Sequence, residues 1–284
     1  MKGARVAVVE ARELGGVCLN RGCIPSKTLI AAAAQYQRMK HAEDFGINLE
    51  VPPVYDWPAM LKRKDKVVKT MTGGIGQLFK SHGVDHYPGF GKITGKEQVT
   101  VIDDAGNETK IPTKNIIVAT GSRSLSLPAF PVDGTRILTS DHLLELEHLP
   151  KKMLIIGAGV IGCEWAFMLA MLDVEVEMVE MMDHALPMED AHCSTLIERE
   201  LKKNKIKLHT KTKVEAVEPG PDGVRAKLSG GATVDANQVL VSIGRAFLTE
   251  DMGLEEVGVK LNKNGSIPTG ADMRTNVKNI YAIG

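Results

Sequence analysis

The sequence predicts an α/β fold with a mostly parallel sheet. Of the 284 residues, 43% are hydrophobic, 25% are charged and 28 are glycine, a composition typical of soluble globular α/β chains. The length is enough for one large or two ordinary domains with a buried core. Valine-rich segments alternate with helical ones, which favours parallel strands joined by helices. A valine-rich strand ending in glutamate occurs twice, as VAVVE at 6–10 and EVEMVE at 175–180.

Charge and cysteine content argue against several classes of protein. The 35 basic and 35 acidic residues cancel, which gives no support to nucleic-acid binding or to docking on a membrane surface. Four cysteines do not make a secreted disulfide scaffold. The apolar run 153–172 is long enough for a bilayer, but Glu164 and three glycines interrupt it, so we interpret it as a buried strand followed by a buried helix. The chain opens directly into a strand, without a signal peptide, and the cytoplasm is the expected compartment.

The first 120 residues are predicted to contain two helices and several short strands. Arg5–Glu10 is valine-rich, as a buried parallel strand would be. Pro25–Met39 is alanine-rich and helical, with proline in its first turn. Trp57–Ser81 is predicted to be a longer helix, although its three glycines weaken it. We expect a β-meander of short antiparallel strands over 84–106 and a further strand over 115–120.

A clearer alternation of strands and helices follows a connecting segment. Residues 126–150 contain several prolines and are predicted to be a crossover without regular structure. Beyond it, strands are expected at 153–156, 175–180, 207–217, 225–236 and 239–243, with helices at 163–172 and 191–204.

The segment GAGVIG, residues 157–162, fits the pattern G-x-G-x-x-G of a dinucleotide-binding turn. A strand precedes it, a helix follows it, and Glu180 lies eighteen residues past the third glycine, at the end of the next strand. Gly157 permits the tight turn, Gly159 lets a pyrophosphate approach the backbone, and Gly162 lets helix and strand pack closely. The helix N-terminus offers N–H groups and a positive dipole end to the phosphates. Glu180 suits a ribose with free hydroxyls and would repel a 2′-phosphate, so NAD is predicted rather than NADP. The alternative is a turn that packs helix on strand and binds nothing.

Two of the four cysteines, Cys18 and Cys23, lie five positions apart in GGVCLNRGCIPSK. A zinc site would need two more ligands, and the other two cysteines are isolated. Core cysteines and an exchangeable disulfide are the other interpretations. Residues five apart in a straight helix are separated by about 7.5 Å of rise, more than the roughly 4.4–6.8 Å between α-carbons that a disulfide requires. A Cys18–Cys23 bridge therefore needs irregular backbone, which Asn20 and Gly22 allow.

The surroundings of the two cysteines favour chemistry over packing. Cys23 comes just before the predicted helix, at the positive end of its dipole, with Lys27 about one turn further on. These features favour the thiolate form of a cysteine. Cys18 lies further out and is better placed to meet a substrate disulfide or dithiol.

Several segments resemble the flavoprotein disulfide reductases, the class I pyridine nucleotide-disulfide oxidoreductase family. GGVCLNRGCIPSK resembles the redox-active motif of that family. The segments TGGIGQLFKSHGVDHYPGFGKI, NIIVATGS, KKMLIIGAGVIGCEWA and VLVSIGR resemble it in the same order, so the resemblance covers essentially the whole chain. Leu19, Ile24 and Ser26, with TGGIGQLFK, favour the lipoamide dehydrogenases over the glutathione and mercuric reductases.

The resemblance implies FAD as a second cofactor beside NAD, and no metal. To FAD it assigns Glu10 at the adenosine ribose and, along the flavin, Gly15, Gly16, Lys27, Ala119, Thr120 and Gly121. To NAD it assigns Gly157, Gly159, Gly162, Glu180, Gly244 and Arg245. Glu164 would pair with Lys27 near the flavin, and Arg245 would cap the nicotinamide half unless it is an ordinary surface arginine.

The activity that the resemblance implies is that of an NAD-dependent dihydrolipoyl dehydrogenase, with Cys18, Cys23, Lys27 and Glu164 as catalytic residues. Dihydrolipoamide, on a carrier domain of a 2-oxo acid dehydrogenase or glycine cleavage complex, would attack the disulfide at Cys18. Cys23 would pass electrons to the flavin, and hydride would go to NAD. The alternatives are an NADPH-dependent disulfide or mercuric-type reductase and a non-catalytic NAD-binding remnant.

The resemblance also predicts how the chain divides into domains. Residues 1–125 would form an FAD-binding domain without its first βα unit, joined by a return segment at about 262–284. Residues 126–150 would be the crossover and 151–261 the NAD-binding domain. The expected fold is thus two Rossmann-like domains in three layers, with the FAD domain incomplete. The C-terminal dimerisation domain of these homodimers is expected to be absent, and the activity of this chain alone to be impaired.

Overall fold

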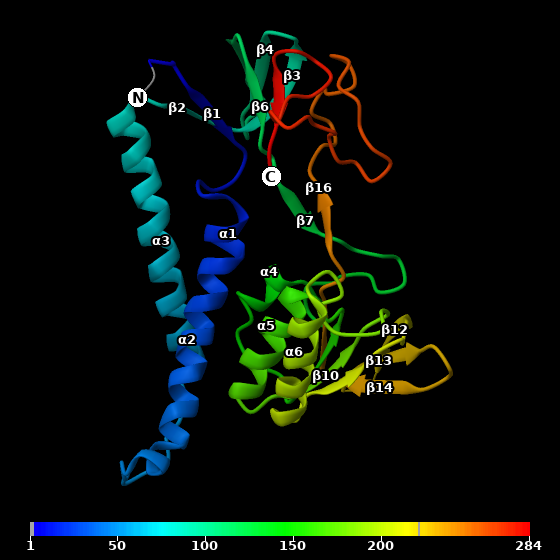
Figure 1. The fold of residues 1–284 in the computed structure, drawn as a ribbon. Coiled ribbons are helices and arrows are strands. Elements are labelled where there is room, and N and C mark those ends of the chain that lie inside the picture. Colours follow the sequence, from blue (N-terminus) through cyan, green and yellow to red (C-terminus); the bar gives the residue numbers. More distant parts are fainter. Residues whose placement is uncertain (1–2, 221) are drawn as a thin grey trace. The chain divides into compact units, whose positions relative to one another are not determined.

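The computed structural model describes residues 3–220 and 222–284 (Figure 1). Contacts between residues divide the chain into two compact units. The first unit contains the residues up to Asn20 together with Lys69–Arg123 and Arg245–Gly284. The second unit contains Arg21–Val68 and Ser124–Gly244. These units are defined by contacts alone. The division predicted from the sequence, into an FAD-binding and an NAD-binding domain, therefore stays a prediction.

The second unit is built on a five-stranded sheet with the order β11-β10-β9-β15-β8. Every neighbouring pair in this sheet is parallel, which confirms the predicted α/β class. The strands are β8 (Ile137–Leu138), β9 (Lys152–Ile156), β10 (Glu175–Val179), β11 (Lys207–His209) and β15 (Gln238–Val241).

Helices cover one face of this sheet and a second, antiparallel sheet covers the other. Successive residues of a strand point to opposite faces, and in β9 Met153 and Ile155 join the helix-side core while Leu154 and Ile156 join the other core. The helices of the unit include α5 (Val160–Met171) and α6 (Ala191–Lys203). The opposite core is closed by β12 (Val214–Gly220), β13 (Gly223–Leu228) and β14 (Thr233–Ala236). Burial on both faces explains why the central strands β9 and β15 are apolar after their first residue.

The apolar run 153–172 is therefore a buried strand and a buried helix, as predicted. It forms β9, the glycine turn and most of α5. In the described part of the chain, no helix combines the length and the apolarity needed to cross a bilayer.

Two long helices begin in the second unit. Helix α2 (Cys23–Lys40) packs on α5, and α3 (Trp57–His82) follows after the short 3-10 helix η1 (Ala42–Phe45). The start of α3 is fixed by two hydrogen bonds to the segment before β9: Trp57 Nε1 donates to Leu146 O at 2.6 Å, and Lys64 Nζ donates to Leu144 O at 2.8 Å. The glycines of α3 face open space and do not interrupt the helix.

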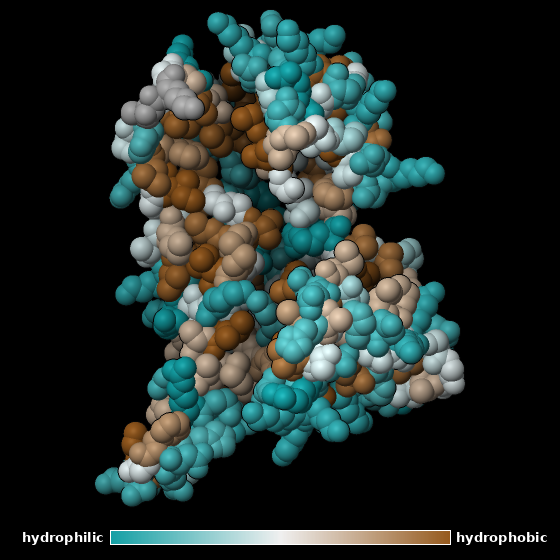
Figure 2. All heavy atoms as spheres, viewed as in Figure 1, coloured by the Kyte–Doolittle hydropathy of each residue, from teal (hydrophilic) through white to brown (hydrophobic). Residues whose placement is uncertain are grey.

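The first unit consists of several small sheets. Strand β1 (Ala7–Glu10) pairs in parallel with β2 (Asp85–Pro88), and β6 (Ile116–Val118) pairs in parallel with β17 (Ile280–Ala282). The predicted meander is β3 (Phe90–Gly95), β4 (Gln98–Ile102) and β5 (Glu108–Pro112). Strand β7 (Ser122–Ser124) pairs with β16 (Arg245–Phe247). Figure 2 shows apolar surface along α3, where Met71 and Leu78 are 43% and 57% exposed.

Several predicted elements differ from the observed ones, each for a local reason. The 126–150 crossover is not irregular, because it contains β8 and the short helix α4 (Ser140–Leu143), which are too brief to produce a periodic pattern. The predicted strand 225–236 is a hairpin, because Gly230 and Gly231 both take positive φ and reverse the chain. The predicted strand 207–217 is two strands, interrupted near Lys211 at φ 50°. Strand β2, expected to be antiparallel, pairs in parallel with β1.

Candidate functional site

The glycine turn at the carboxyl end of β9 has backbone geometry that demands glycine at two positions. Gly157 has φ +97°, and a Cβ there would lie 2.5 Å from Ser242 O. A Cβ on Gly162 would lie 2.1 Å from Gly157 O, so α5 could not approach the turn. Gly159 differs, because a Cβ there would meet nothing within 4 Å. The turn is therefore closed on the protein side and open at Gly159, where a phosphate could reach the backbone.

Helix α5 presents a bare N-terminus at this opening. Its N-cap is Gly159, which provides no side-chain cap, and Val160 in the first turn is 51% exposed. The first N–H groups of a helix lack partners within the helix, and the dipole makes this end positive. An anion such as a pyrophosphate would supply the missing acceptors. The turn and helix thus fit the group that the sequence predicts.

Glu180 follows the last residue of β10 and is held rigidly against the glycine turn. Its Oε2 accepts from Ala158 N at 2.7 Å and its Oε1 accepts from Met182 N at 2.9 Å. The residue is only 7% exposed. Each carboxylate oxygen can accept more than one hydrogen bond, so a ribose diol can be received beside the turn. A 2′-phosphate would meet a fixed negative charge there.

Ser242 is a member of this site that the sequence analysis missed. It follows β15, and its hydroxyl lies 3.0 Å from both Ile156 O and Gly157 O, to which it donates. Ser242 N also donates to Ile156 O at 2.8 Å. The residue therefore holds the glycine turn against the neighbouring strand. Its position in VLVSIGR, at the carboxyl end of a parallel strand, is the signal that could have identified it.

Cys163 lies in the first half of α5 and is buried. Burial, together with the nearby charges of Glu180 and Glu164, raises the pKa of its thiol to about 12. Its Sγ lies 3.4 Å from Ala158 O, to which it donates. Cys163 is therefore a packing residue that stays protonated.

The predicted NAD residues Gly244 and Arg245 lie just after β15. Gly244 has φ +122°, and a Cβ there would meet nothing within 4 Å. The guanidinium of Arg245 is fixed on β7, with Nε donating to Ser122 Oγ at 2.7 Å and Nη2 donating to Ser122 O at 2.6 Å. Arg245 is thus not an ordinary surface arginine, and its role toward a nicotinamide stays a prediction.

The predicted FAD residues of the first unit lie at strand ends, in turns and at the start of α1 (Gly16–Arg21), and all of them except the half-buried Glu10 are exposed. Glu10 is the last residue of β1, a position similar to that of Glu180 after β10. Glu10 Oε1 accepts a hydrogen bond from Arg12 N at 2.9 Å. Gly16 and Gly121 have φ of +66° and +74° and face open space. Gly15, at φ +110°, packs on Leu19.

The Ala119–Thr120–Gly121 segment is fixed to the strand region that follows β16. Thr120 Oγ1 donates to Leu248 O at 2.6 Å, and Leu248 N donates to Gly121 O at 3.1 Å. The first unit therefore offers a carboxylate at the end of β1 and open glycines, which fits part of an FAD. A glycine turn followed by a helix, of the kind at 157–162, does not precede β1 in the described residues.

The two cysteines of the predicted dithiol lie on different helices. Cys18 is in α1 (Gly16–Arg21), a helix that the sequence analysis did not predict, and Cys23 is the first residue of α2. Between them Gly22 has φ −136° and ψ −116°, so the segment is not one regular helix, as a bridge requires. Both cysteines are exposed. Helix α2 begins at Cys23 rather than at the expected Pro25, because Gly22 O accepts from Ser26 N.

Lys27 and Glu164, which the resemblance pairs, form an ion pair. Lys27 Nζ lies 2.5 Å from Glu164 Oε1, and the two side chains are 57% and 31% exposed. This confirms the predicted pairing, and it accounts for an acid in the otherwise apolar α5. Through this pair the helix that starts at Cys23 is bonded to the helix that starts at the glycine turn.

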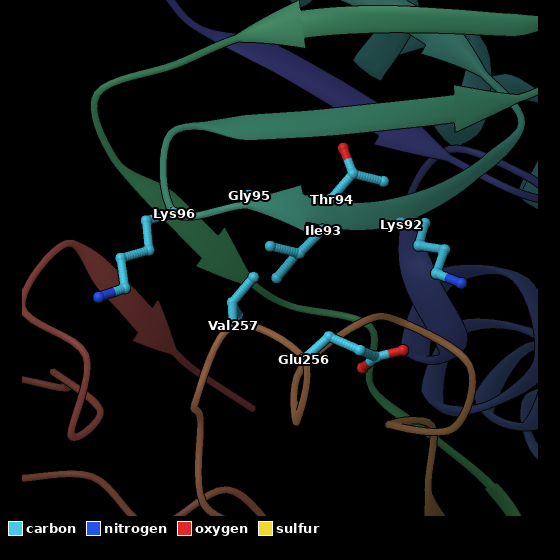
Figure 3. Close-up of a pocket in the computed structure, with 7 residues that line it drawn as sticks. All are labelled: Lys92, Ile93, Thr94, Gly95, Lys96, Glu256 and Val257. Atoms are coloured by element: carbon cyan, nitrogen blue, oxygen red, sulfur yellow. The ribbon is translucent and has the colours of Figure 1, made fainter.

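Other cavities of the described residues do not contain the predicted site. In the first unit, a cavity of about 440 Å³ lies between β3 and the loop after Leu254 (Figure 3), and it is lined by Lys92, Ile93, Thr94, Gly95, Lys96, Glu256 and Val257. In the second unit, a cavity of about 700 Å³ lies at the amino ends of β9 and β15, the sheet edge opposite the glycine turn. No cluster of three His, Cys, Asp or Glu side chains suited to a metal ion occurs within the described ranges.

The geometry defines a class of protein: a parallel α/β sheet with a dinucleotide-binding turn at its carboxyl edge and a cysteine pair flanking a helix start. The family model of the pyridine nucleotide-disulphide oxidoreductases matches residues 1–284. The chain belongs to this family. Its members use FAD and NAD(P).

Curated relatives and solved structures agree with the family. A dihydrolipoyl dehydrogenase of Chlamydia pneumoniae is 42% identical over 99% of this chain, and one of Bacillus subtilis is 41% identical over 99%. The crystal structure of LpdA from Mycobacterium tuberculosis has a TM-score of 0.93 at 27% identity and covers 100% of this chain and 62% of its own. The chain spans about 60% of the length of the curated relatives it matches.

Proposed function

We propose that the protein acts as an NAD-dependent dihydrolipoyl dehydrogenase, with the site residues and domain division given above. The observation that carries this proposal is the Lys27–Glu164 ion pair at 2.5 Å. It bonds the helix that starts at Cys23 to the helix of the glycine turn, so Cys23 and the proposed dinucleotide-binding turn lie on neighbouring helices of one unit. The relatives named dihydrolipoyl dehydrogenase support the same activity.

The proposed thiol chemistry uses the two exposed cysteines. One thiolate of dihydrolipoamide attacks Cys18 Sγ of the Cys18–Cys23 disulfide, the S–S bond breaks, and Cys23 leaves as a thiolate. The second substrate thiol then displaces Cys18, which releases lipoamide and leaves both cysteines reduced. FAD, when bound, supplies the step that takes two electrons from the dithiol to NAD. The start of α2 stabilises the negative charge on Cys23 through its dipole.

The remaining residues bind and orient. Gly157, Gly159 and Gly162 form the phosphate-binding turn, Glu180 receives the ribose of NAD, and Ser242 holds the turn on the sheet. Gly244 and Arg245 are proposed beside the nicotinamide half. On the FAD side we propose Glu10 at the ribose, with Gly15, Gly16, Lys27, Ala119, Thr120 and Gly121 along the flavin.

A second candidate function is an NADPH-dependent disulfide or mercuric-type reductase. It is favoured by the fold of the flavoprotein disulfide reductase RclA of Escherichia coli, whose structure matches with a TM-score of 0.85 at 25% identity. The fixed carboxylate of Glu180 argues against a 2′-phosphate. The proposed partner is accordingly dihydrolipoamide on a carrier domain of a 2-oxo acid dehydrogenase or glycine cleavage complex, and the proposed location is the cytoplasm.

Titration of the purified chain with NAD, NADP and FAD tests the proposal. We expect NAD to bind at least about tenfold more tightly than NADP. We expect FAD to be held weakly, because Glu10 and the open glycines Gly16 and Gly121 fit only part of that cofactor. A preference for NADP would overturn the dinucleotide assignment, and a stoichiometric flavin retained through gel filtration would overturn the expectation for FAD. Lipoamide-dependent oxidation of NADH, measured with added FAD, tests the activity itself.

A further inference from the structure

Helix α2 is bonded to α5 at two places that lie about three turns apart along α2. Near its start, Lys27 meets Glu164. Near its end, Tyr36, Gln37 and Lys40 meet the residues that terminate α5. The starts of the two helices lie together and so do their ends, so the helices run in the same direction (Figure 1).

The contact at the helix ends is centred on Asp173. Tyr36 Oη donates to Asp173 Oδ2 at 3.0 Å, and Lys40 Nζ donates to Asp173 Oδ1 at 2.6 Å. Gln37 Nε2 donates to Met171 O at 2.5 Å, and Tyr55 Oη donates to Leu172 O at 3.2 Å. The last carbonyls of a helix lack partners within the helix, so side chains from outside α5 supply the donors that its C-terminus needs.

Asp173 stands at a position where a helix usually ends with glycine. Its φ is +62°, with Asp173 N donating to Ala170 O and Val174 N donating to Leu169 O, the hydrogen-bond pattern of a Schellman motif. A left-handed backbone is strained for residues other than glycine and points to a role of the side chain. Here that side chain is the acceptor for both Tyr36 and Lys40.

The surroundings of Tyr36 and Lys40 keep both side chains protonated, so both remain hydrogen-bond donors to Asp173. Burial and the hydrogen bond to Asp173 raise the pKa of Tyr36, so its hydroxyl remains a donor at neutral pH. The hydrogen bond to Asp173 raises the pKa of Lys40, so its ammonium stays charged. Tyr36 also packs edge-on against Tyr55, with ring centroids 5.1 Å apart.

We propose that Tyr36, Lys40 and Asp173 are positioning residues that set the register of α2 on α5 and thereby hold Lys27 on Glu164. A slip of one residue along α2 would move Lys27 by about 1.5 Å and turn it by about 100°. A contact of 2.5 Å would not survive that change. The contact of Asp173 with Tyr36 and Lys40 positions the start of α2, where Cys23 lies. Its importance for activity therefore rests on the proposed function, in which Cys23 reacts.

Zero-length cross-linking with a carbodiimide reads this register directly. The reagent joins a lysine amine to a carboxylate in contact, so the unmodified protein should give Lys27–Glu164, Lys40–Asp173 and Lys227–Glu218 cross-links, each quantified by peptide mass spectrometry. The Lys227–Glu218 pair, at 2.6 Å between β13 and β12, is a matched control in the same unit. The measurement needs neither FAD nor turnover, so its result does not depend on whether the proposed activity is correct.

Asp173→Asn is the first variant, because asparagine tolerates the left-handed backbone but loses the charge. We expect the Lys27–Glu164 cross-link to fall by about fivefold or more, with Lys227–Glu218 unchanged. Lys40→Arg should restore most of the Lys27–Glu164 yield lost in Lys40→Met. An unchanged Lys27–Glu164 yield in Asp173→Asn overturns the proposal.

A second variant keeps the test decisive if Asp173→Asn disturbs the whole unit and lowers the control cross-link as well. Tyr36→Phe combined with Lys40→Met removes both donors and leaves Asp173 and the ring contact with Tyr55 in place. A selective loss of Lys27–Glu164 in this variant supports the proposal. An undiminished Lys27–Glu164 yield, or one that falls only in step with Lys227–Glu218, overturns it.

Discussion

The two units achieve burial in different ways. The second has one five-stranded parallel sheet covered on both faces, and the twelve largest fully buried side chains of the described residues all belong to it. The first has sheets of two or three strands and a smaller core around Ile93, Ile116 and Ile280. Two-stranded sheets are marginal by themselves. The comparison indicates that the second unit has a large core of its own, whereas the first unit consists of several small sheets around one smaller core.

The largest expected effect concerns the second unit's core. Burial, together with the charges of Glu180 and Glu164, raises the pKa of Cys163 from 9.0 to about 12. The thiolate, which is the reactive form, should therefore be about a thousandfold rarer than in an unperturbed thiol. We expect Cys163 to be alkylated by iodoacetamide at pH 8 about a thousandfold more slowly than the exposed Cys193. Comparable alkylation rates would show that the core of the second unit opens readily, which would contradict the difference between the units described above.

The ionisation of Cys163 should also make the free energy of unfolding depend on pH. The thiol ionises near its usual pKa in the unfolded chain and only near 12 in the folded one. Unfolding is thus favoured as the pH rises above about 9. Cys163→Ser, measured by thermal unfolding between pH 7 and 10, should flatten this dependence.

A matched pair of glycines tests whether the units are independent. A Cβ on Gly162 would lie 2.1 Å from Gly157 O in the second unit, and a Cβ on Gly253 would lie 2.1 Å from Ile93 O in the first. We expect Gly162→Ala and Gly253→Ala each to destabilise its own unit by about 3 kcal/mol. Hydrogen exchange should show each loss of protection confined to one unit. Loss throughout the chain in both variants would mean that the units unfold together.

A buried carboxylate distinguishes the second unit further. Glu177 Oε2 lies 2.9 Å from Lys152 Nζ and its Oε1 lies 2.8 Å from His209 Nε2, with only 5% of its side chain exposed. Burial alone would raise the pKa of Glu177, but the hydrogen bonds to Lys152 and His209 outweigh it and lower that pKa. The stability that it contributes is complete above about pH 4.5 and is lost as the pH falls below it.

The corresponding variant is Glu177→Gln. We expect it to lower the free energy of unfolding by about 2 kcal/mol at pH 7, with less effect in acid, as measured by urea unfolding at both pH values. An equal loss at pH 7 and in acid would contradict the charge-based account.

The smallest expected effect separates binding from stability. Glu180→Gln should weaken NAD binding about tenfold, or about 1.4 kcal/mol, and narrow the preference over NADP, as measured by calorimetry. Glu177→Gln, three residues earlier and within β10, serves as the control and should leave the NAD to NADP ratio unchanged. If both variants change the ratio equally, Glu180 acts through the stability of β10 and not on the ribose.

Much of the fold and of the site could be predicted because it depends on local rules. The glycines at 157, 159 and 162 and the glutamate eighteen residues on follow from backbone clearance and phosphate binding, which one βαβ unit contains. The hairpin at Gly230 and Gly231 was missed because a turn inside a valine-rich run leaves the apolar pattern intact. The 3.0 Å contacts of Ser242 were missed because they join residues about eighty-five positions apart.

The family, the parallel α/β class, the glycine turn, the cysteine pair and the Lys27–Glu164 pairing could all be inferred from the sequence. Three features became visible only in the folded chain. Ser242 supports the glycine turn, burial keeps Cys163 protonated, and Asp173 accepts hydrogen bonds at the end of α5. The reason is physical. Periodicity and backbone clearance are local properties of the chain, whereas burial and side-chain contacts depend on which distant segments pack together.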